Sequence, residues 1–166
     1  MSVEEPMTVE GAIDRYADMV YRVALSQMKN QADAEDLFQE VFVRLVKHMD
    51  KMKSWEHVKA WLLKVTVNCA RKHFDGAWHR RVTFLEETEY LAETGESSLM
   101  EKEHPVRDAV EELPEKYRLV IHLFYYEELS VTEIARITNQ KESTVKSQLF
   151  RAREMLRESL KGDPDL

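Results

Sequence analysis

This 166-residue sequence contains little of what builds turns, crosslinks or membrane spans. It has four glycines and four prolines, which favours long helices over a many-stranded sandwich or barrel. Its one cysteine, Cys69, cannot close an internal disulfide, so nothing requires an oxidising compartment. The longest apolar run, Leu119 to Tyr126, falls far short of the ~20 residues of a membrane span, and the acidic start does not resemble a secretory signal. We therefore expect a helical, cytoplasmic protein without membrane insertion.

Charge is distributed unevenly along the chain. The 31 acidic and 24 basic residues give a formal net charge of −7, which alone argues weakly against nucleic-acid binding. However, residues 57–81 carry a net charge of +5, residues 82–116 carry −8, and residues 136–161 carry +4. The two basic blocks are either solvated helix faces or the local footprints of a nucleic-acid-binding protein.

Apolar residues recur at helical spacing through the first part of the chain. The spacing predicts helices over about residues 10–29 and 33–49, and a third that starts at residue 54 and can reach residue 79. Asp33 and Ser54 are the expected N-caps of the second and third helices.

The middle of the chain differs from its ends. Residues 82–104 are rich in acids and show little sustained periodicity, which is typical of an extended linker. A second helical unit begins near Pro105. The sequence thus predicts an all-α fold with two small helical domains, residues 1–81 and 105–161, joined by an acidic linker over residues 82–104.

The most specific pattern lies in the last third of the chain. Ser130-Val-Thr-Glu133 has the form of a capping box and opens a short helix. A turn over residues 138–142 follows, and then a longer helix, capped by Ser143 or Thr144, that runs to about Leu160. Two helices joined in this way predict a helix-turn-helix, whose second helix enters the major groove of DNA.

The outer face of that second helix carries groups suited to DNA. Lysine and arginine donate to guanine edges or phosphates, serine donates to either, and phenylalanine contacts a thymine methyl. The alternative is an amphipathic bundle whose outer face happens to be basic. An exposed aromatic among the basic residues argues against it. The residues on this face are Lys146, Ser147, Phe150 and Arg151.

These patterns resemble region 4 of bacterial sigma factors, specifically of the extracytoplasmic-function (ECF) group. The resemblance rests on segments 113–120, 130–135 and 144–156, and independently on segments 33–44 and 61–71, which are similar to regions 2.2 and 2.3–2.4. It implies a non-catalytic subunit that binds core RNA polymerase and directs it to promoters by recognising −10 and −35 elements. It also implies that the subunit helps to melt the −10 element.

The resemblance further implies three sets of contact residues. The clamp helices of the polymerase β′ subunit would meet an outward face of carboxylates, an amide and an aromatic, formed by Asp36, Gln39, Glu40 and Phe42. The −10 element, with one base flipped beside Asn68, would contact Lys64, Asn68, Arg71, Lys72, Arg80 and Arg81. The −35 element would contact Thr144, Lys146, Ser147, Phe150 and Arg151.

This chain departs from the family at several of these positions. Many relatives carry Phe-Arg-Gly in the loop that forms the base pocket. This chain has Met52-Lys53-Ser54 there, so the identity of the flipped base stays open. Met52 or Trp55 can stack on bases, although Trp55 can equally belong to the core. Relatives often have arginine at the position of Lys146, and lysine lacks the bidentate fork, which shifts or softens the −35 preference. His79, with its two arginine neighbours, resembles an upstream duplex contact.

Partners follow from the same resemblance. It implies core RNA polymerase, contacted through the β′ clamp helices and the β flap, promoter DNA, and an anti-sigma factor. The acidic linker either threads toward the basic catalytic cleft of the polymerase or serves as a spacer only. Cys69 and His73 supply just two ligands, so no metal, cofactor or catalytic site is expected. A two-part sensor-regulator and a helical adaptor are the alternatives, and neither explains the region 2 patterns.

Overall fold

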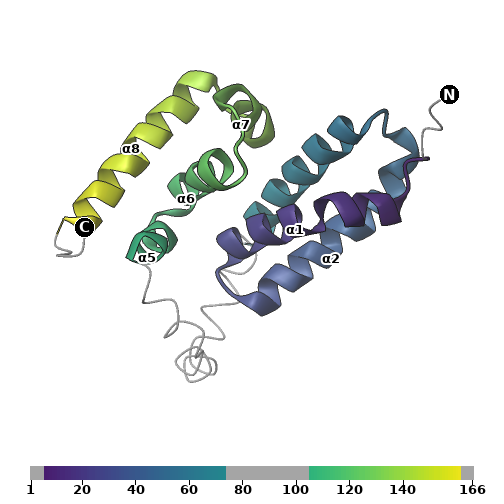
Figure 1. Cartoon of the computed structure of the whole chain (residues 1–166), viewed down its shortest axis with the longest axis horizontal. Coiled ribbons are helices and arrows are strands. Elements are labelled where there is room, and N and C mark those ends of the chain that lie inside the picture. The colour runs from purple at the N-terminus through teal and green to yellow at the C-terminus, as the bar shows by residue number, and fades with distance from the viewer. Residues whose placement is uncertain (1–5, 74–104, 162–166) are drawn as a thin grey trace.

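The computed structural model describes residues 6–73 and 105–161, and every regular element in these two ranges is helical. The first unit contains α1 (Val9–Met28), α2 (Gln31–His48), the short helix η1 (Met49–Lys51) and a third helix over residues 55–73. The second unit contains α5 (Pro105–Glu112), α6 (Glu115–Ile121), the π-helical turn η3 (His122–Tyr126), α7 (Val131–Thr138) and α8 (Glu142–Leu160). Figure 1 shows the two helical units side by side, which confirms the all-α fold class. The linker predicted over residues 82–104 lies outside the described residues.

The helices of the first unit begin and end at residues with specific hydrogen bonds. Lys29, with a left-handed φ of 65°, ends α1. Asn30 then caps α2, because its Oδ1 accepts a hydrogen bond of 2.8 Å from the amide of Asp33. The prediction of Asp33 as the cap is therefore wrong, since this residue lies in the first turn of the helix. Ser54 caps the third helix as predicted, its Oγ accepting from the amide of His57 at 3.0 Å.

α7 and α8 form the predicted helix-turn-helix. The capping box is confirmed, because Ser130 Oγ accepts from the amide of Glu133 and Glu133 Oε1 accepts from the amide of Ser130, both at 3.1 Å. The chain leaves α7 at Asn139, whose φ of 55° lies in the left-handed region. Asparagine tolerates this conformation better than most residues, so the turn forms without glycine.

The start of α8 differs from the prediction. The helix begins at Glu142, and the side chain of Lys141 before it makes no capping hydrogen bond. The prediction that Ser143 or Thr144 caps α8 is wrong, because both residues lie inside its first turn. Instead, the hydroxyl of Thr132 in α7 donates to the carboxylate of Glu142. This contact links the beginnings of the two helices.

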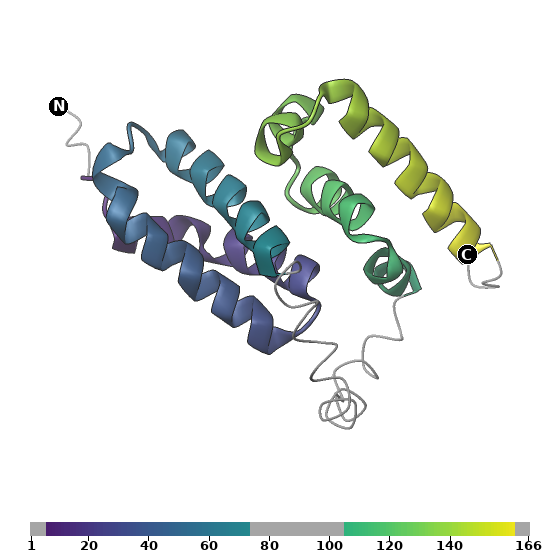
Figure 2. The same cartoon turned by 180° about the vertical axis from the view of Figure 1, so that it is seen from behind.

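α1 packs against elements of both units. It contacts α2 in the first unit and α6 and η3 in the second. Figure 2 shows the second unit beside the first from behind, with α8 at the outer edge. The buried apolar side chains form one core that runs from the first unit into the second, and its largest fully buried members include Leu37, Leu62, Leu123 and Ile134. The two units thus share packing in this arrangement.

Candidate nucleic-acid and protein interfaces

All five residues predicted as −35 contacts on α8 lie on its exposed side. Val145, Leu149 and Ala152 are buried and hold the inner side of the helix against α5, α6 and α7. Residues three and four apart are neighbours on a helix, so the exposed side chains gather on the first half of α8. The aromatic among them is 62% exposed. The structure brings together Thr144, Lys146, Ser147, Phe150 and Arg151.

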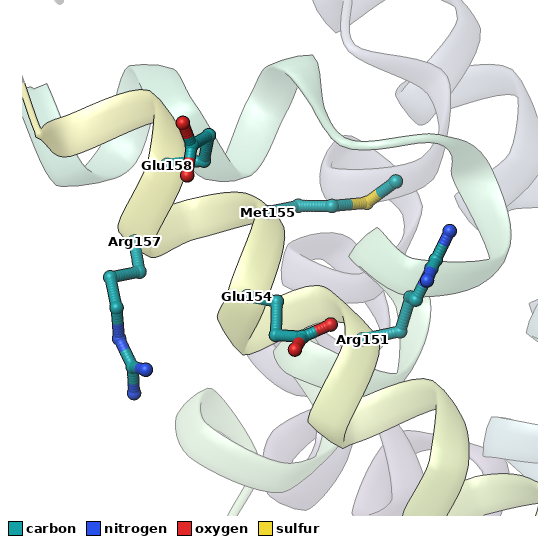
Figure 3. A pocket seen from close by; sticks show the side chains of 5 residues that line it. All are labelled: Arg151, Glu154, Met155, Arg157 and Glu158. Carbon is teal, nitrogen blue, oxygen red and sulfur yellow. The ribbon is translucent and has the colours of Figure 1, made fainter.

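Beyond Arg151 the surface of α8 changes character. A shallow pocket there is lined by two arginines, two glutamates and a methionine, namely Arg151, Glu154, Met155, Arg157 and Glu158. Figure 3 shows Arg151 and Met155 extending to one side of the helix and Arg157 extending away from them. Carboxylates repel a phosphate backbone, so the purely basic part of the face ends near Arg151.

Arg153 was not predicted from the sequence, although it helps to position the exposed face of α8. Its Nε donates to the hydroxyl of Tyr125 at 2.7 Å, and its guanidinium lies 5.6 Å from the ring centres of Phe124 and Tyr125. These contacts fasten α8 to η3 and so help to set the direction of the exposed face. No spacing rule pairs residues 28 positions apart, so the sequence carried no signal for this contact.

The third helix presents a second exposed basic face. Leu63, Val67 and Ala70 are each 1% exposed and form its inner side. Asn68 lies on the outer side, with one basic residue a turn before it and two a turn after it. The structure thus brings together Lys64, Asn68, Arg71 and Lys72. The remaining predicted contacts of this set, His79, Arg80 and Arg81, lie outside the described residues.

The loop before the third helix offers no free side chain for stacking. Met52 is 8% exposed and belongs to the core, so the idea that it stacks on bases is wrong. Trp55 lies 6.3 Å from the ring of Tyr16, and the guanidinium of Arg15 lies 4.3 Å from its ring centre. A side chain at Gly11 would come within 2.9 Å of the indole, so glycine permits this packing. Of the two alternatives for Trp55, the structure favours the core.

On α2, Asp36 and Gln39 are exposed, whereas Glu40 is engaged within the protein. Glu40 accepts from Arg44 Nη2 and pairs with His73 Nε2, both at 3.0 Å, so it joins α2 to the end of the third helix. Burial acts to raise the pKa of Glu40, but the hydrogen bonds from His73 and Arg44 outweigh it and lower the pKa. Glu40 therefore carries a negative charge that is already partly matched.

Phe42 does not lie on the outer face of α2. It is 7% exposed and packs against Phe38, with 4.8 Å between the ring centres, so the prediction of an outward aromatic is wrong. The exposed apolar side chains are instead Val43 and Val46, at 59% and 61%. A helix turns 100° per residue, which places Val43 between Gln39 and Lys47 on the outer side. The spacing of four residues from Gln39 to Val43 is the pattern from which the exposure of Val43 could have been predicted.

The described parts of the chain hold no set of three or more histidine, cysteine or acidic side chains arranged for a metal ion. No helix within these ranges combines the length and apolar character needed to cross a bilayer.

Cys69 is buried, and burial, with a smaller contribution from Glu40, raises the pKa of its thiol. The thiol is therefore held in its protonated form.

Known proteins resemble this chain over most of its length. The family model described as "Sigma-70 region 2" matches residues 12–80, and that described as "Sigma-70, region 4" matches residues 103–156. RNA polymerase sigma factor SigV of Bacillus subtilis (strain 168) is 34% identical over 137 residues, which cover 82% of this chain and 81% of SigV. ECF RNA polymerase sigma factor SigM of the same organism is 33% identical over 163 residues, which cover 91% of this chain and 94% of SigM.

Solved structures share the arrangement of helices. The sigma factor RpoE, in complex with the anti-sigma factor NepR from Bartonella quintana, aligns with a TM-score of 0.67 at 23% identity and covers 93% of this chain and 97% of its own. CnrH in complex with the cytosolic domain of CnrY aligns with a TM-score of 0.64 at 22% identity, covering 93% of this chain and 88% of its own. At these identities the likeness concerns the fold.

Proposed function

This chain belongs to the sigma-70 family of RNA polymerase sigma factors, in the ECF group, and we propose that three separate faces carry out its task. As a sigma factor it binds core RNA polymerase, recognises promoters and initiates transcription. It acts as a dissociable, non-catalytic subunit in the cytoplasm. The three faces lie on α2, on the third helix and on α8.

The outer face of α2 binds the clamp helices of the polymerase β′ subunit. The exposed Asp36 and Gln39 supply the polar contacts, and the exposed Val43 and Val46 supply apolar area. Glu40 contributes mainly by holding α2 to the third helix, through His73. Phe42 supports this face from within the core and does not touch the partner.

The outer face of the third helix binds the −10 element. Lys64, Arg71 and Lys72 are exposed on the side of Asn68 and neutralise phosphates of the single strand. An amide both donates and accepts, which suits Asn68 to the edge of a base that has left the stack. Holding that base favours the melted form of the −10 element. Arg80 and Arg81 extend the same contact beyond the described residues.

The first half of α8 binds the −35 element in the major groove. The observation that carries the proposal is the gathering of Thr144, Lys146, Ser147, Phe150 and Arg151 on one exposed side of a helix that follows a capped turn. In such a motif the first half of the second helix is the part that reaches base edges. Lys146 and Arg151 supply the positive charge, and Phe150 supplies the apolar contact to a thymine methyl.

Domains and partners complete the proposal. Residues 1–81 form the region 2 domain, residues 105–161 form the region 4 domain, and the acidic linker over residues 82–104 follows the basic path toward the catalytic cleft of the polymerase. The second unit also docks on the β flap. RpoE and CnrH were each solved in complex with a second protein, an anti-sigma factor in the case of RpoE, and we infer that an anti-sigma factor also binds this chain.

In-vitro transcription with purified core polymerase tests the function directly. A library of promoters is transcribed with and without this chain, and we expect specific starts only when the chain is present. Either of two results would support a sensor-regulator instead. Transcription starts would appear equally without the chain, or the chain would repress transcription at one operator and produce no starts that depend on core polymerase.

Two amide-to-alanine variants test how the faces divide the work. Asn68→Ala should reduce promoter opening, read by permanganate reactivity of unpaired thymines, while binding to core polymerase stays unchanged. Gln39→Ala should weaken binding to core polymerase. When enough variant is added to saturate the polymerase, the pattern of unpaired thymines should be unchanged. Each variant is the control for the other, since both remove one exposed amide from a helix of the same unit. Normal opening by Asn68→Ala would contradict the assigned role.

A further inference from the structure

The turn between α6 and α7 places two tyrosines on the surface. η3 winds as a π-helix, and the amide of Glu127 donates to the carbonyl of His122, five residues earlier, at 3.1 Å. The chain then passes through Glu128, whose φ of 57° lies in the left-handed region that residues with a side chain rarely adopt. Both features are uncommon, and such departures gather at functional sites. They leave Tyr125 and Tyr126 each 52% exposed.

A buried carboxylate holds this turn in place. The side chain of Glu127 is 3% exposed, and His122 Nε2 lies 2.8 Å from it. Arg22 of α1 donates to both of its oxygens, at 2.8 Å and 3.1 Å. Burial acts to raise the pKa of Glu127, but hydrogen bonds from His122 and Arg22 outweigh it and lower the pKa to about 2. The carboxylate is therefore charged, paired and buried, and it fixes the tyrosines that precede it.

The turn in turn fixes the exposed Arg153 of α8. Its Nε donates to the hydroxyl of Tyr125 at 2.7 Å, and its guanidinium lies 5.6 Å from the ring centres of Phe124 and Tyr125. Within residues 6–73 and 105–161, its two terminal amino groups make no hydrogen bond. The Tyr125 hydroxyl accepts from Arg153, so its own hydrogen is available to another acceptor. An arginine fork and a hydroxyl hydrogen thus lie side by side on the surface.

These donors suit a phosphate group. The amino groups of a guanidinium form a planar fork that matches two phosphate oxygens, and a hydroxyl can donate to the same group. The contacts with Phe124 and Tyr125 restrict the arginine before any ligand arrives. Restriction of this kind lowers the entropy that binding costs.

Arg153 lies on the flank of α8, beside the proposed −35 face. It follows the buried Leu149 by four residues, which places it about 40° around the axis from that side chain. It follows Lys146 by seven residues, so these two side chains point within about 20° of each other, two turns apart. A helix with its side chains is about 10–12 Å wide and the major groove is about 12 Å wide, so the flanks of a helix in the groove face the phosphates along its edges.

We propose that Arg153 and Tyr125 form a seat for one backbone phosphate of the −35 duplex, and that this contact sets how α8 lies in the major groove. The proposal rests on the proposed function, in which the first half of α8 binds the −35 element. A phosphate contact carries no sequence information, but it fixes the register and orientation of a protein on the duplex. Arg153 and Tyr125 are therefore positioning residues, and the reading of bases stays with Phe150 and its neighbours.

Neutral phosphate analogues test the seat. Holoenzyme is assembled from core polymerase and the full chain, and its dissociation constant is measured on promoter duplexes whose −35 phosphates are replaced one at a time by methylphosphonate. Tyr125→Phe removes only the hydroxyl, and Arg153→Lys keeps the charge but lacks the fork. Each should weaken binding to the unmodified duplex by about three- to tenfold, as the loss of one hydrogen bond does. Each should also stop responding to one methylphosphonate that weakens binding by the wild type.

Each variant has a matched control. Tyr126→Phe removes the hydroxyl of the neighbouring, equally exposed tyrosine, whose ring stacks on His122 with 5.2 Å between the ring centres. Arg157→Lys makes the same change one turn further along α8, where Figure 3 shows the side chain extending away from Arg151. Both controls should bind as the wild type does and respond to the same phosphates.

Three results would overturn the seat. The variants would bind as tightly as the wild type, or they would bind more weakly yet respond to every phosphate as the wild type does, or their loss would fall on one base pair of the −35 element. The second result would mean that Arg153 only packs α8 on η3. A wild-type holoenzyme without preference for the −35 element would refute the proposed role of α8. One that prefers this element but is unaffected by both substitutions would refute the seat alone.

Discussion

Two helices of similar length, α2 in the first unit and α8 in the second, each carry one phenylalanine that sequence reasoning placed on a contact surface. Phe42 on α2 is 7% exposed, whereas Phe150 on α8 is 62% exposed. The difference follows from the position of each helix. α2 packs on α1 and is joined to the third helix by the Glu40–His73 contact, while α8 lies at the outer edge and meets its neighbours from one side.

A helix held on two sides needs a wider buried stripe than a helix held on one. On α2 that stripe extends from Leu37 and Val41 to Phe38 and Phe42, which follow at steps of 100° around the axis. On α8 the stripe is narrow, so polar and aromatic residues at the other positions stay outside. A family resemblance therefore transfers more safely to an edge helix than to a central one.

The largest expected effect tests this comparison directly. Phe42→Ala should lower the free energy of unfolding by about 3–5 kcal/mol, because it leaves a cavity in the core. Phe150→Ala should change it by less than about 0.5 kcal/mol, as an exposed residue does, while weakening −35 binding. Urea denaturation measures the first quantity and electrophoretic mobility shift of the holoenzyme the second. Equal stability of the two variants would contradict the assignment of Phe42 to the core.

The two units also differ in how deeply their paired carboxylates, Glu40 and Glu127, are buried. The folded pKa of Glu127, about 2, lies below its ordinary value of 4.5, so its stabilising contribution is present above pH 4.5 and is lost as the pH falls toward 2. Glu127→Gln should therefore cost about 3 kcal/mol at neutral pH, with the difference from the wild type narrowing between pH 4.5 and 2.

Glu40 in the first unit is the control for that measurement. Its pKa is also lowered, but its side chain is 35% exposed and solvent screens its partners, so Glu40→Gln should cost less. Thermal unfolding followed across this pH range measures both variants. A Glu40→Gln loss as large as that of Glu127→Gln would show that exposure does not separate the two sites.

A smaller effect concerns the outer face of α8. Arg151→Ala should weaken −35 binding by about 1–3 kcal/mol if the arginine reads a base, and the loss should fall on one position of the element. Arg157→Ala removes the same charge six residues later, among the glutamates of the pocket in Figure 3, and should have little effect. Footprinting on a −35 series measures both. Matching losses for the two variants would mean that α8 supplies only diffuse charge.

The smallest effect tests what the two units share. Asn30 caps α2 and Ser130 caps α7 in the same way, through a side-chain oxygen and the amide three residues on. Asn30→Ala and Ser130→Ala should each lower the free energy of unfolding by about 1 kcal/mol. Urea denaturation of both variants would show whether local capping is equivalent in the two units, and clearly unequal losses would contradict that equivalence.

The sequence predicted most reliably what depends on neighbouring residues. The capping box at Ser130 and the exposed side of α8 follow from spacings of three and four, and the structure confirms both. The cap at Asp33 was predicted wrongly because Asn30, three residues earlier, begins the helix and caps it. The exposure of Phe42 and Met52 was predicted wrongly because it depends on which neighbours pack on the helix or loop. The contact of Arg118 with Ser26 joins residues 92 positions apart, and no pattern in the sequence predicts it.

The core that runs without a break from the first unit into the second has a thermodynamic consequence. While the units are packed together, heat or denaturant should dissolve them in one cooperative transition, so a weak core on one side lowers the melting temperature of both. Once apart, each unit is a domain of fewer than about 85 residues, a size at which folding is only marginally favourable. Polymerase and promoter would then replace the lost neighbour, and complex formation would stabilise each unit by mass action.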